Sequence, residues 1–502
     1  MSKLIVVRNA VVLGVLLIVA GVLGLAAAAL AGLTVAPAPS YELARVAVAV
    51  AEKSFVPGLA GLVAALLASK ALDSQLRWIA GAIALLGLVA LAISLAPPLQ
   101  ALLIARDHGF HLDPVRYLTA PIEREVGRAP FTINHATVAG HKLNLDVYPA
   151  PAEAPKPGAP DPARRAIVLV HGGGWSAGER SETARANAQL AAQGFHVFDI
   201  DYRLAPQARW KEMTGDVKCA IGWIKRHAQL RLGDRTIAID PARVALLGRS
   251  AGGQLALLAG FSTGDTILPP SCAVDDSGVD AIIAFYAPTD LVWGYANPTR
   301  PQVYDSGAKL RGLMGGPPEA VGNAYERASP SVRAHAKAPP VLLVHGERDQ
   351  LVSPLHVDWL IGRLQALGVY NQQLKIPYAQ HGFDYVVGGL SSQLAVAATV
   401  HFLAEVDRRR AAPGADSGSG SASPSPLPSP APSPSNAPAG VAAPAPAAAP
   451  AAAPSAVPPS ASAAARLPTP AALPSATHAP APSATRPHTP SATPHPRLRH
   501  AK

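Results

Sequence analysis

The sequence predicts a chain of three parts, in which the central part is an α/β domain with a mostly parallel sheet flanked by helices. Two features of the 502 residues support this prediction: apolar residues dominate the N-terminus, and proline, alanine and serine dominate the C-terminus. Between them, from about residue 130 to 408, short apolar runs alternate with helical segments. Such runs are typical of strands buried on both faces of a parallel sheet, and this length is sufficient for one well-buried core.

The first part, residues 1–106, is predicted to contain two or three transmembrane helices, at about 9–32, 50–69 and 78–97. From Asn9 to Tyr41 the only ionisable group is a tyrosine phenol, and Trp78 to Ala105 carries no charge. Both stretches exceed the roughly 20 apolar residues that a helix needs to cross a bilayer. Pro97 and Pro98 interrupt the second stretch, and we expect the span to end near them.

The segment from Ser54 to Ser69 is apolar but short. It can cross the membrane if residues 47–50 join it and if Glu52 and Lys53 pair inside the helix. It can alternatively lie along the membrane surface. Hydropathy and length favour three spans over two.

The basic residues near the predicted spans favour a cytoplasmic N-terminus. Lys3 and Arg8 precede the first span, and Lys70 and Arg77 bracket the loop before the last one. With three spans, the α/β domain would lie on the outer side of the inner (cell) membrane. In a Gram-negative bacterium this side is the periplasm. A cleaved signal peptide fits less well, because the apolar run exceeds the usual 7 to 15 residues and further apolar segments follow.

A glycine-rich loop follows the first strongly apolar strand of the α/β domain. The strand is predicted at residues 166–170, and the sequence His-Gly-Gly-Gly-Trp occupies residues 171–175. Glycines let the main chain approach a ligand closely, so that backbone N–H groups can stabilise an oxyanion.

A second motif, Gly-Arg-Ser-Ala-Gly-Gly at residues 248–253, lies between a predicted strand at 244–247 and a predicted helix at 254–259. Strand, tight turn and helix form the context in which a serine nucleophile projects from a strained turn. Ser250 is therefore the candidate nucleophile, and the small residues around it fit the crowding of such a turn.

A serine nucleophile requires a histidine base and a carboxylate, in the chain order serine, acid, histidine. The acid is predicted to be Asp349, which follows the strand at 340–344, and the base His381, which follows the strand at 373–377. Glu347 is the rival acid, but Asp349 lies further into its loop and is favoured. His345 precedes the candidate acid and is predicted to be a packing residue.

These motifs resemble those of α/β-hydrolase carboxylesterases, and specifically the feruloyl-esterase-like and acetyl-esterase-like group that neighbours the hormone-sensitive-lipase group. The resemblance implies the α/β-hydrolase fold, with Ser250 as nucleophile, Asp349 orienting the base and His381 carrying the proton. It also implies an oxyanion hole made by the amides of Gly173, Gly174 and Ala251. The resemblance covers about residues 130 to 406 and rests on the following segments: 171–175, 201–206, 216–218, 239–241, 248–253, 286–291, 329–330, 339–340, 345–349 and 381–383.

Two features leave the substrate open. Arg249 stands where the hormone-sensitive-lipase group usually has an acidic residue. Tyr286 and the region of Tyr295 are candidates for the pocket lining. We expect a membrane-anchored serine esterase that forms an acyl-enzyme and acts on a small-molecule ester. A deacetylase, peptidase or formamidase with the same triad and a non-catalytic membrane scaffold are the alternatives.

No cofactor, catalytic metal or nucleic-acid partner is expected. Asp199 and Asp201 lack further ligands at metal-binding spacing, and no recognition motif accompanies the net charge of +10. Cys219 and Cys272 can pair in an oxidising compartment or remain free thiols. The third part, residues 411–502, has almost no large apolar residue and is predicted to be a disordered tail.

Overall fold

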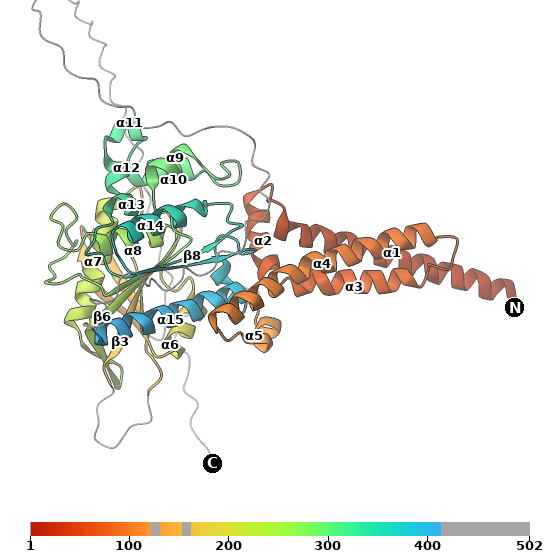
Figure 1. Ribbon diagram of the computed structural model, residues 1–502, viewed down its shortest axis with the longest axis horizontal. Helices are drawn as coiled ribbons and strands as arrows, with labels where there is room; N and C mark the ends of the chain where they lie inside the picture. Colours follow the sequence, from red (N-terminus) through yellow and green to blue (C-terminus); the bar gives the residue numbers. More distant parts are fainter. Residues whose placement is uncertain (1, 122–130, 153–161, 413–502) are drawn as a thin grey trace, which may run out of the picture. The chain divides into compact units, whose positions relative to one another are not determined.

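A computed structural model of the chain describes residues 2–121, 131–152 and 162–412 (Figure 1). The predicted tail lies outside the described residues from position 413 onward. Residues 109–412 form what we call the sheet domain, and residues 2–108 form the N-terminal helical region. The two regions belong to one compact unit of the chain.

The sheet domain has the predicted α/β architecture, with a mostly parallel sheet. Its strand order is β1-β2-β4-β3-β6-β7-β8-β9, and β5 pairs with β6. Strands β4, β3, β6, β7, β8 and β9 are parallel neighbours, whereas β2 is antiparallel to β1 and to β4. The strands are β1 (Phe131–Val138), β2 (His141–Tyr148), β3 (Arg164–Val170), β4 (His196–Ile200), β5 (Gln229–Leu232), β6 (Arg235–Arg249), β7 (Ala281–Phe285), β8 (Val341–Gly346) and β9 (Asn371–Ile376).

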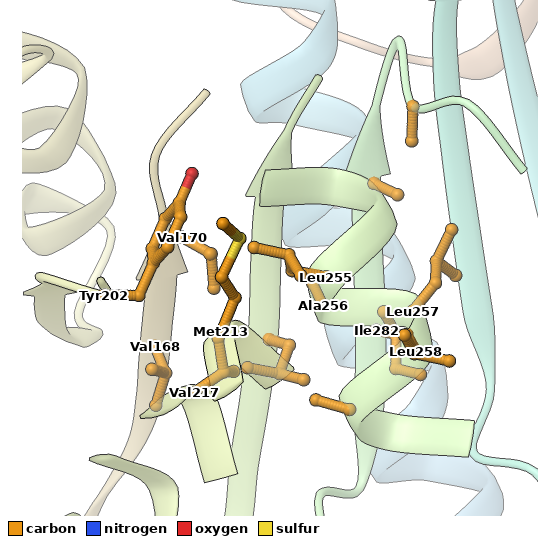
Figure 2. Packing of buried hydrophobic residues seen from close by; sticks show 14 of the residues in the cluster. Val168, Val170, Tyr202, Met213, Val217, Leu255, Ala256, Leu257, Leu258 and Ile282 are labelled. Atoms are coloured by element: carbon orange, nitrogen blue, oxygen red, sulfur yellow. The ribbon is translucent and has the colours of Figure 1, made fainter. Parts of the chain in front are cut away.

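Helices cover both faces of this sheet, because alternate residues of each central strand point to opposite faces. On one face, Val168 and Ile282 pack with residues of α7 and α8, as Figure 2 shows for Met213, Leu255 and their neighbours. On the other face, Leu169 and Leu247 pack with α6 and α15. The helices of the domain are α5 (Pro114–Thr119), α6 (Ala184–Ala192), α7 (Trp210–Arg226), α8 (Ala251–Phe261), α9 (Leu291–Ala296), α10 (Ser306–Met314), α11 (Pro318–Val321), α12 (Ala324–Arg327), α13 (Pro330–Arg333), α14 (Leu355–Ala366), the 3₁₀ helix η1 (Phe383–Tyr385) and α15 (Leu390–Ala411).

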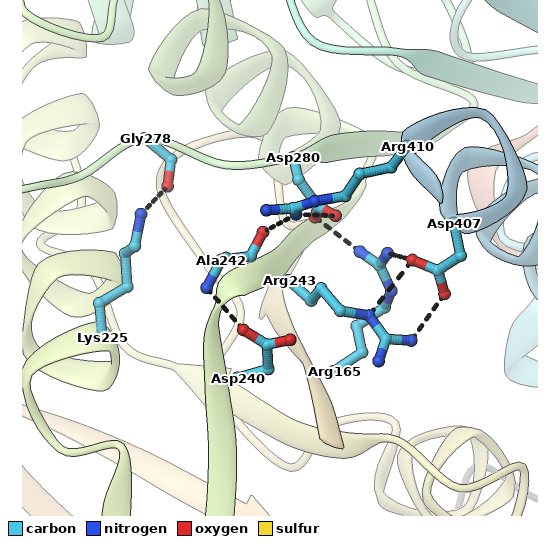
Figure 3. Close-up of polar contacts among 9 residues, drawn as sticks. All are labelled: Arg165, Lys225, Asp240, Ala242, Arg243, Gly278, Asp280, Asp407 and Arg410. Atoms are coloured by element: carbon cyan, nitrogen blue, oxygen red, sulfur yellow. Dashed lines mark hydrogen bonds and ion pairs between the residues drawn. The ribbon is translucent and has the colours of Figure 1, made fainter. Parts of the chain in front are cut away.

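A network of ion pairs connects the C-terminal end of α15 to the sheet (Figure 3). The buried guanidinium of Arg165 on β3 contacts Asp280 at 2.6 Å and Asp407 on α15 at 2.5 Å. Arg243 on β6 contacts the other oxygen of Asp407 at 2.6 Å. A buried arginine is tolerated because two carboxylates share its charge. The network fixes α15, which begins nine positions after His381.

In the N-terminal region, α1 (Ser2–Val35), α3 (Phe55–Ser69) and α4 (Arg77–His108) pack side by side (Figure 1). Helices α3 and α4 approach so closely that a Cβ on Gly61 would overlap the carbonyl oxygen of Gly87, and the converse also holds. Small residues allow this packing, as they do between helices in membranes. Two helical stretches, Ala10–Val35 and Arg77–His108, are long and apolar enough to cross a membrane.

The predicted helix at 50–69 is instead two helices. Helix α2 (Tyr41–Glu52) meets α3 at an angle of 79°. The two helices are long and apolar enough to cross a membrane only if they are taken together as one span. The suggested pairing of Glu52 and Lys53 inside one helix is not what the structure contains. Glu52 accepts a hydrogen bond from the Ser391 amide, and Lys53 donates to the carbonyl of Tyr117, so both charges at the bend bind the sheet domain.

Helix α4 extends beyond the point where its span was predicted to end. It runs through Pro97 and Pro98 to His108 and ends at Gly109, whose φ is +66°. The segment after the prolines is held by tertiary packing: Ala101 and Ala105 are buried against the sheet domain. Packing of this kind can outweigh the two backbone hydrogen bonds that the prolines remove.

Candidate active site

Ser250 lies at the tight turn between β6 and α8. Its φ is +52° and ψ is −120°, which is an unfavourable conformation for a residue other than glycine. The turn is held because the Ser250 amide donates to the carbonyl of Phe285 on β7 at 2.9 Å. A Cβ on Gly252 would overlap the carbonyl oxygens of Val170 and His171, so glycine is required there. The strained turn exposes the serine hydroxyl at the carboxyl end of the sheet.

The structure brings Ser250, His381 and Asp349 together. The distance between His381 Nε2 and Ser250 Oγ is 2.9 Å, and the distance between His381 Nδ1 and Asp349 Oδ2 is 2.7 Å. His381 follows β9 and Asp349 follows β8, so both loops lie at the same edge of the sheet as the serine. The rival acid Glu347 is exposed and makes no contact with His381 among the interactions of the described residues.

The Asp349 carboxylate is fully buried and ionised. Its Oδ1 accepts hydrogen bonds from the amides of Leu351 and Val352 at 2.8 and 2.9 Å. Its Oδ2 lies 3.2 Å from His345 Nε2 as well as contacting His381. Burial by itself would raise the pKa of Asp349, but His381 and His345 hold that pKa well below its ordinary value. His345, which was predicted only to pack at the turn, is thus a second partner of this carboxylate.

The three residues expected to form the oxyanion hole surround Ser250 from two segments. Gly173 and Gly174 have φ values of +116° and +60°. A Cβ on Gly173 would overlap the carbonyl of Ala177, and one on Gly174 would overlap the hydroxyl of Tyr304. Ala251 is the first residue of α8, where a backbone N–H has no partner within the helix. The arrangement provides backbone donors beside a serine hydroxyl.

Comparison with known proteins shows what the sheet domain resembles. The family model BD-FAE matches residues 147–364, the segment that holds the glycine-rich loop, Ser250 and Asp349. The esterase LipC of Mycobacterium tuberculosis is 34% identical to this chain over 254 residues, which are 49% of this chain and 59% of LipC.

Two further proteins resemble this chain. The probable carboxylic ester hydrolase LipM of M. tuberculosis is 29% identical over 245 residues, which are 48% of this chain and 54% of LipM. A propionate-bound thermophilic esterase from Thermogutta terrifontis has 24% identity and a TM-score of 0.45, and the alignment covers 56% of this chain and 96% of that one. The chain spans only about 54 to 61% of the length of LipC, LipM and the esterase LipQ of the same organism.

Arg249, the residue that departs from the lipase pattern, lies inside the sheet domain. Its side chain is only 2% exposed and forms an ion pair with Asp384 in η1. Asp384 also accepts a hydrogen bond from the Tyr286 hydroxyl at 2.5 Å, and the Tyr286 ring lies 4.5 Å from that of His381. Burial, followed by the charge of Asp384, raises the pKa of Tyr286 well above its ordinary value, so Tyr286 remains a hydrogen-bond donor. This cluster joins the serine turn to the histidine loop, and the unusual arginine was its only signal in the sequence.

The end of α1 contacts the two loops that carry Asp349 and His381. Gln350 Oε1 accepts from the Ala38 amide at 2.7 Å, and Gln350 Nε2 donates to Gln380 Oε1 at 3.0 Å. Arg348 donates to the carbonyl of Val35 at 3.0 Å. Residues on both sides of Asp349, and the residue before His381, are therefore connected to the N-terminal helical region.

Two hollows meet at Ser250. A cavity of about 660 Å³ includes His381 and Tyr286 in its wall, together with residues from α2. A recess of about 40 Å³ lies on the side of Ala251 and Trp175 and does not include His381. Tyr295, which was a candidate for the lining, is in neither wall; its ring packs against Tyr325. The contribution of α2 was not predicted from the sequence.

The remaining candidates have structural contacts. Asp199 accepts hydrogen bonds from the Ser181 amide and the Asn187 side chain, each at 2.7 Å, and Asp201 pairs with Arg180 at 2.7 Å. Burial raises the pKa of Asp199 to about 7. Cys219 in α7 and Cys272 form a disulfide, with their Cα atoms 5.4 Å apart. The sequence had left this pairing open.

Proposed function

We propose that this protein is a hydrolase that cleaves carboxylic esters in two steps. Ser250 is first acylated, and water then releases the acyl group from it. The hydrogen-bond chain from Ser250 through His381 to Asp349 is the observation that supports this most directly. Esterases such as LipC among the relatives support the same reaction.

In the first step, Ser250 Oγ attacks the ester carbon while His381 Nε2 takes the hydroxyl proton. The tetrahedral intermediate carries an oxyanion, which the amides of Gly173, Gly174 and Ala251 would stabilise. Each such donor typically contributes on the order of 3 kcal/mol to the transition state. The protonated His381 then gives its proton to the leaving alcohol oxygen, the bond from carbon to that oxygen breaks, and an acyl-serine remains.

In the second step, a water molecule replaces the alcohol. His381 takes a proton from the water, the hydroxide adds to the acyl carbon, and collapse of the intermediate returns the proton to Ser250. Asp349 remains ionised throughout, because its low pKa reflects the positively charged imidazole that it faces. It fixes the tautomer of His381 and stabilises the imidazolium.

The test of this mechanism is covalent labelling combined with turnover. A fluorophosphonate should label the wild-type chain at Ser250 and should fail to label Ser250→Ala. The wild type should release acid from p-nitrophenyl esters faster than from matched peptide or formamide substrates. A chain that folds but is neither labelled nor active on any of these would support the non-catalytic scaffold instead.

We also propose that the N-terminal region anchors the hydrolase in the membrane by three passes, with the hydrolase domain on the outer side. Two contacts support helices that cross in alternating directions. Val35 at the end of α1 and Lys53 before α3 both contact the hydrolase domain. The α3–α4 turn, by contrast, lies between Lys70 and Arg77. These basic residues favour the cytoplasmic side. The disulfide between Cys219 and Cys272 agrees with an oxidising compartment for the domain.

Reporter fusions test this orientation. A reporter that is active only outside the cytoplasm should be active when fused after residue 106, and a cytoplasmic reporter fused there should be silent. The opposite pattern would reject the three-pass arrangement and leave the esterase proposal untouched.

A further inference from the structure

Of the two hollows at Ser250, only one contains His381, and this difference decides how an ester can bind. Both include Gly174, Ser250 and Tyr304 in their walls, but only the 660 Å³ cavity includes His381. In ester cleavage the leaving alcohol oxygen must take its proton from His381. The alcohol part of the ester therefore belongs in the cavity, and the acyl part belongs in the recess of about 40 Å³.

The recess limits the length of the acyl group. Each water-sized group in a cavity needs roughly 10 to 15 Å³ of its volume. The space of about 40 Å³ thus accommodates about three such groups beyond the reacting carbon. Large side chains close it, among them Trp175, Leu291 and Leu310, and each of these is at most 5% exposed. A short acyl group, such as acetyl or propionyl, fits, whereas a long one would have to displace buried side chains.

The cavity for the alcohol is walled partly by α2. Tyr41, Arg45, Val48 and Ala49 recur at helical spacing along one side of this helix, and all four line the cavity. Glu42, Ala44 and Val46 of α2 also line it, whereas Ala47, Val50 and Ala51 are buried outside the cavity wall. The Tyr41 ring stacks on that of Tyr304 at 6.1 Å, which fixes the start of α2 beside the catalytic serine.

The helix that forms this wall is joined at both ends to the apolar helices. Helix α1 ends at Val35, shortly before Tyr41, and α3 begins at Phe55, shortly after Glu52. Both charged residues at the α2–α3 bend bind the hydrolase domain, as described above. A molecule that lies in the same bilayer as α1 and α3 needs only to extend beyond their ends to reach α2.

The chemistry of the cavity wall fits an amphiphile. Glu182, Lys309 and Tyr385 supply polar groups from the hydrolase domain. Val46, Val48 and Ala49 of α2, with Val386, supply apolar surface. A purely polar alcohol would leave the valine side chains without an apolar partner, and a purely apolar one would desolvate the charged groups without replacing their hydrogen bonds.

We propose that the substrate is a short-chain acyl ester of an amphiphilic alcohol held in the lipid bilayer, and that α2 binds the alcohol part. This inference rests on the proposed ester hydrolysis and on the proposed membrane anchoring. Water is the second reactant, the ester C–O bond breaks, and the products are a short carboxylic acid and the free alcohol, which stays in the membrane.

The acyl side is tested with p-nitrophenyl esters of two to ten carbons and the full-length protein in detergent. The kcat/KM should be highest for two to four carbons and should fall at least tenfold by eight. A maximum at eight or ten carbons would overturn the assignment of the recess.

The alcohol side is tested with two glucosides that carry the same 6-O-acetyl group, one with a dodecyl and one with a methyl aglycone. Acetate release is measured with the full-length protein in phosphatidylcholine vesicles. The kcat/KM should be at least tenfold higher for the dodecyl compound. An equal or lower value would overturn the proposal.

Variants of α2 separate binding by this helix from simple enrichment of the dodecyl compound in the vesicle. Ala49→Trp fills the cavity and should reduce the dodecyl-to-methyl ratio at least tenfold. Leu43→Trp, on the same helix but outside the cavity wall, should leave the ratio unchanged. Retention of the ratio in Ala49→Trp, or its equal loss in both variants, would contradict a role for α2.

Failure of this inference can be distinguished from failure of the esterase proposal. If the wild type hydrolyses p-nitrophenyl acetate and Ser250 is labelled, but the preferences for short acyl groups and anchored alcohols are absent, only the inference falls. If Ser250 is not labelled and p-nitrophenyl acetate is not hydrolysed, the esterase proposal falls with it.

Discussion

The N-terminal helices and the sheet domain, which is the proposed hydrolase domain, differ in the size of the side chains that they bury. In the helices, the buried residues include Ala27, Ala64 and Ala90, whereas Ile18 and Leu25 are 68% and 65% exposed. In the hydrolase domain, the fully buried residues include many large ones, such as Phe198, Leu246 and Ile282. Water drives large apolar groups inward, but a lipid environment gives no such drive, so helices there associate through close contact of small residues.

With the helical region in a membrane, as we propose, the same chain is folded by two different forces. In the hydrolase domain, burial of apolar area dominates, and strained features such as the Ser250 turn are held by the rigid sheet around them. In the helical region, the shape of the backbone contact between Gly61 and Gly87 matters more than the amount of apolar area. Helix α2 belongs to both regions, because its small residues are buried and its polar and apolar side chains line the cavity.

The largest expected effect concerns catalysis, because all three proposed catalytic residues lie in the hydrolase domain and none lies in the N-terminal helices. Ser250→Ala and His381→Ala should each lower kcat for p-nitrophenyl acetate by about 10⁴-fold or more, because each removes a member of a unit that acts together. Thermal unfolding and circular dichroism should match the wild type. Activity above a hundredth of the wild-type value in either variant would contradict the assignment.

The next effect distinguishes the two candidate acids. Asp349→Asn should lower kcat by about 10⁴-fold, because the neutral amide no longer stabilises the imidazolium or holds its tautomer. Glu347→Gln, an exposed position in the same loop, is the matched control and should retain activity. The reverse pattern would show that the acid has been misassigned.

A pair of truncations tests the contrast in packing. Leu246→Ala in the hydrolase core should cost about 2 to 5 kcal/mol of stability, through lost burial and the cavity left behind. Leu25→Ala, at an exposed position of α1, should change stability by less than about 0.5 kcal/mol. Both are measured by thermal unfolding in the same detergent. Equal losses would mean that the two regions are stabilised in the same way.

Acid should destabilise the hydrolase domain through buried neutral histidines. Burial lowers the pKa of His356 to about 3 and that of His171 to about 4, so the folded state stays unprotonated where the unfolded state takes up protons. Stability should therefore fall as the pH drops from about 6.5 towards 4, by roughly 2 kcal/mol for each histidine at pH 5.

The pH effect is measured as the difference in unfolding midpoint between pH 7.5 and pH 5. His356 Nδ1 accepts from the amides of Thr289 and Asp290, each at 3.3 Å, so a proton there removes both bonds. His356→Gln should reduce the pH-dependent difference, whereas His141→Gln, at an exposed turn, should not. An undiminished difference in His356→Gln would exclude this histidine as a cause.

The smallest effect concerns the helical region. Gly61→Leu should destabilise the contact between α3 and α4 by about 1 to 3 kcal/mol, because the side chain would overlap backbone. Gly14→Leu, where no atom lies within 4 Å of the added Cβ, is the control and should have no such effect. The measurement is thermal unfolding in detergent, and equal behaviour of the two variants would contradict close packing at Gly61.

The sequence alone determined the mostly parallel sheet, the two long apolar helices and the chain order of the candidate residues Ser250, Asp349 and His381. These depend on local patterns, namely apolar runs of strand length and polar residues directly after them, which a linear sequence displays. The length of α4 beyond Pro98 could not be predicted, because packing of Ala101 and Ala105 against the domain overrides a local signal to end the helix.

Only the tertiary structure decided which distant residues support the site. His345 contacts Asp349, Asp384 pairs with Arg249, and Gln350 binds the end of α1. The place of α2 beside Ser250 was likewise decided by the fold, because nothing in residues 41–52 indicates a serine some two hundred positions later. Local sequence specifies an element, but the energy of a buried polar contact or a shared cavity depends on two segments that meet only when the chain is folded.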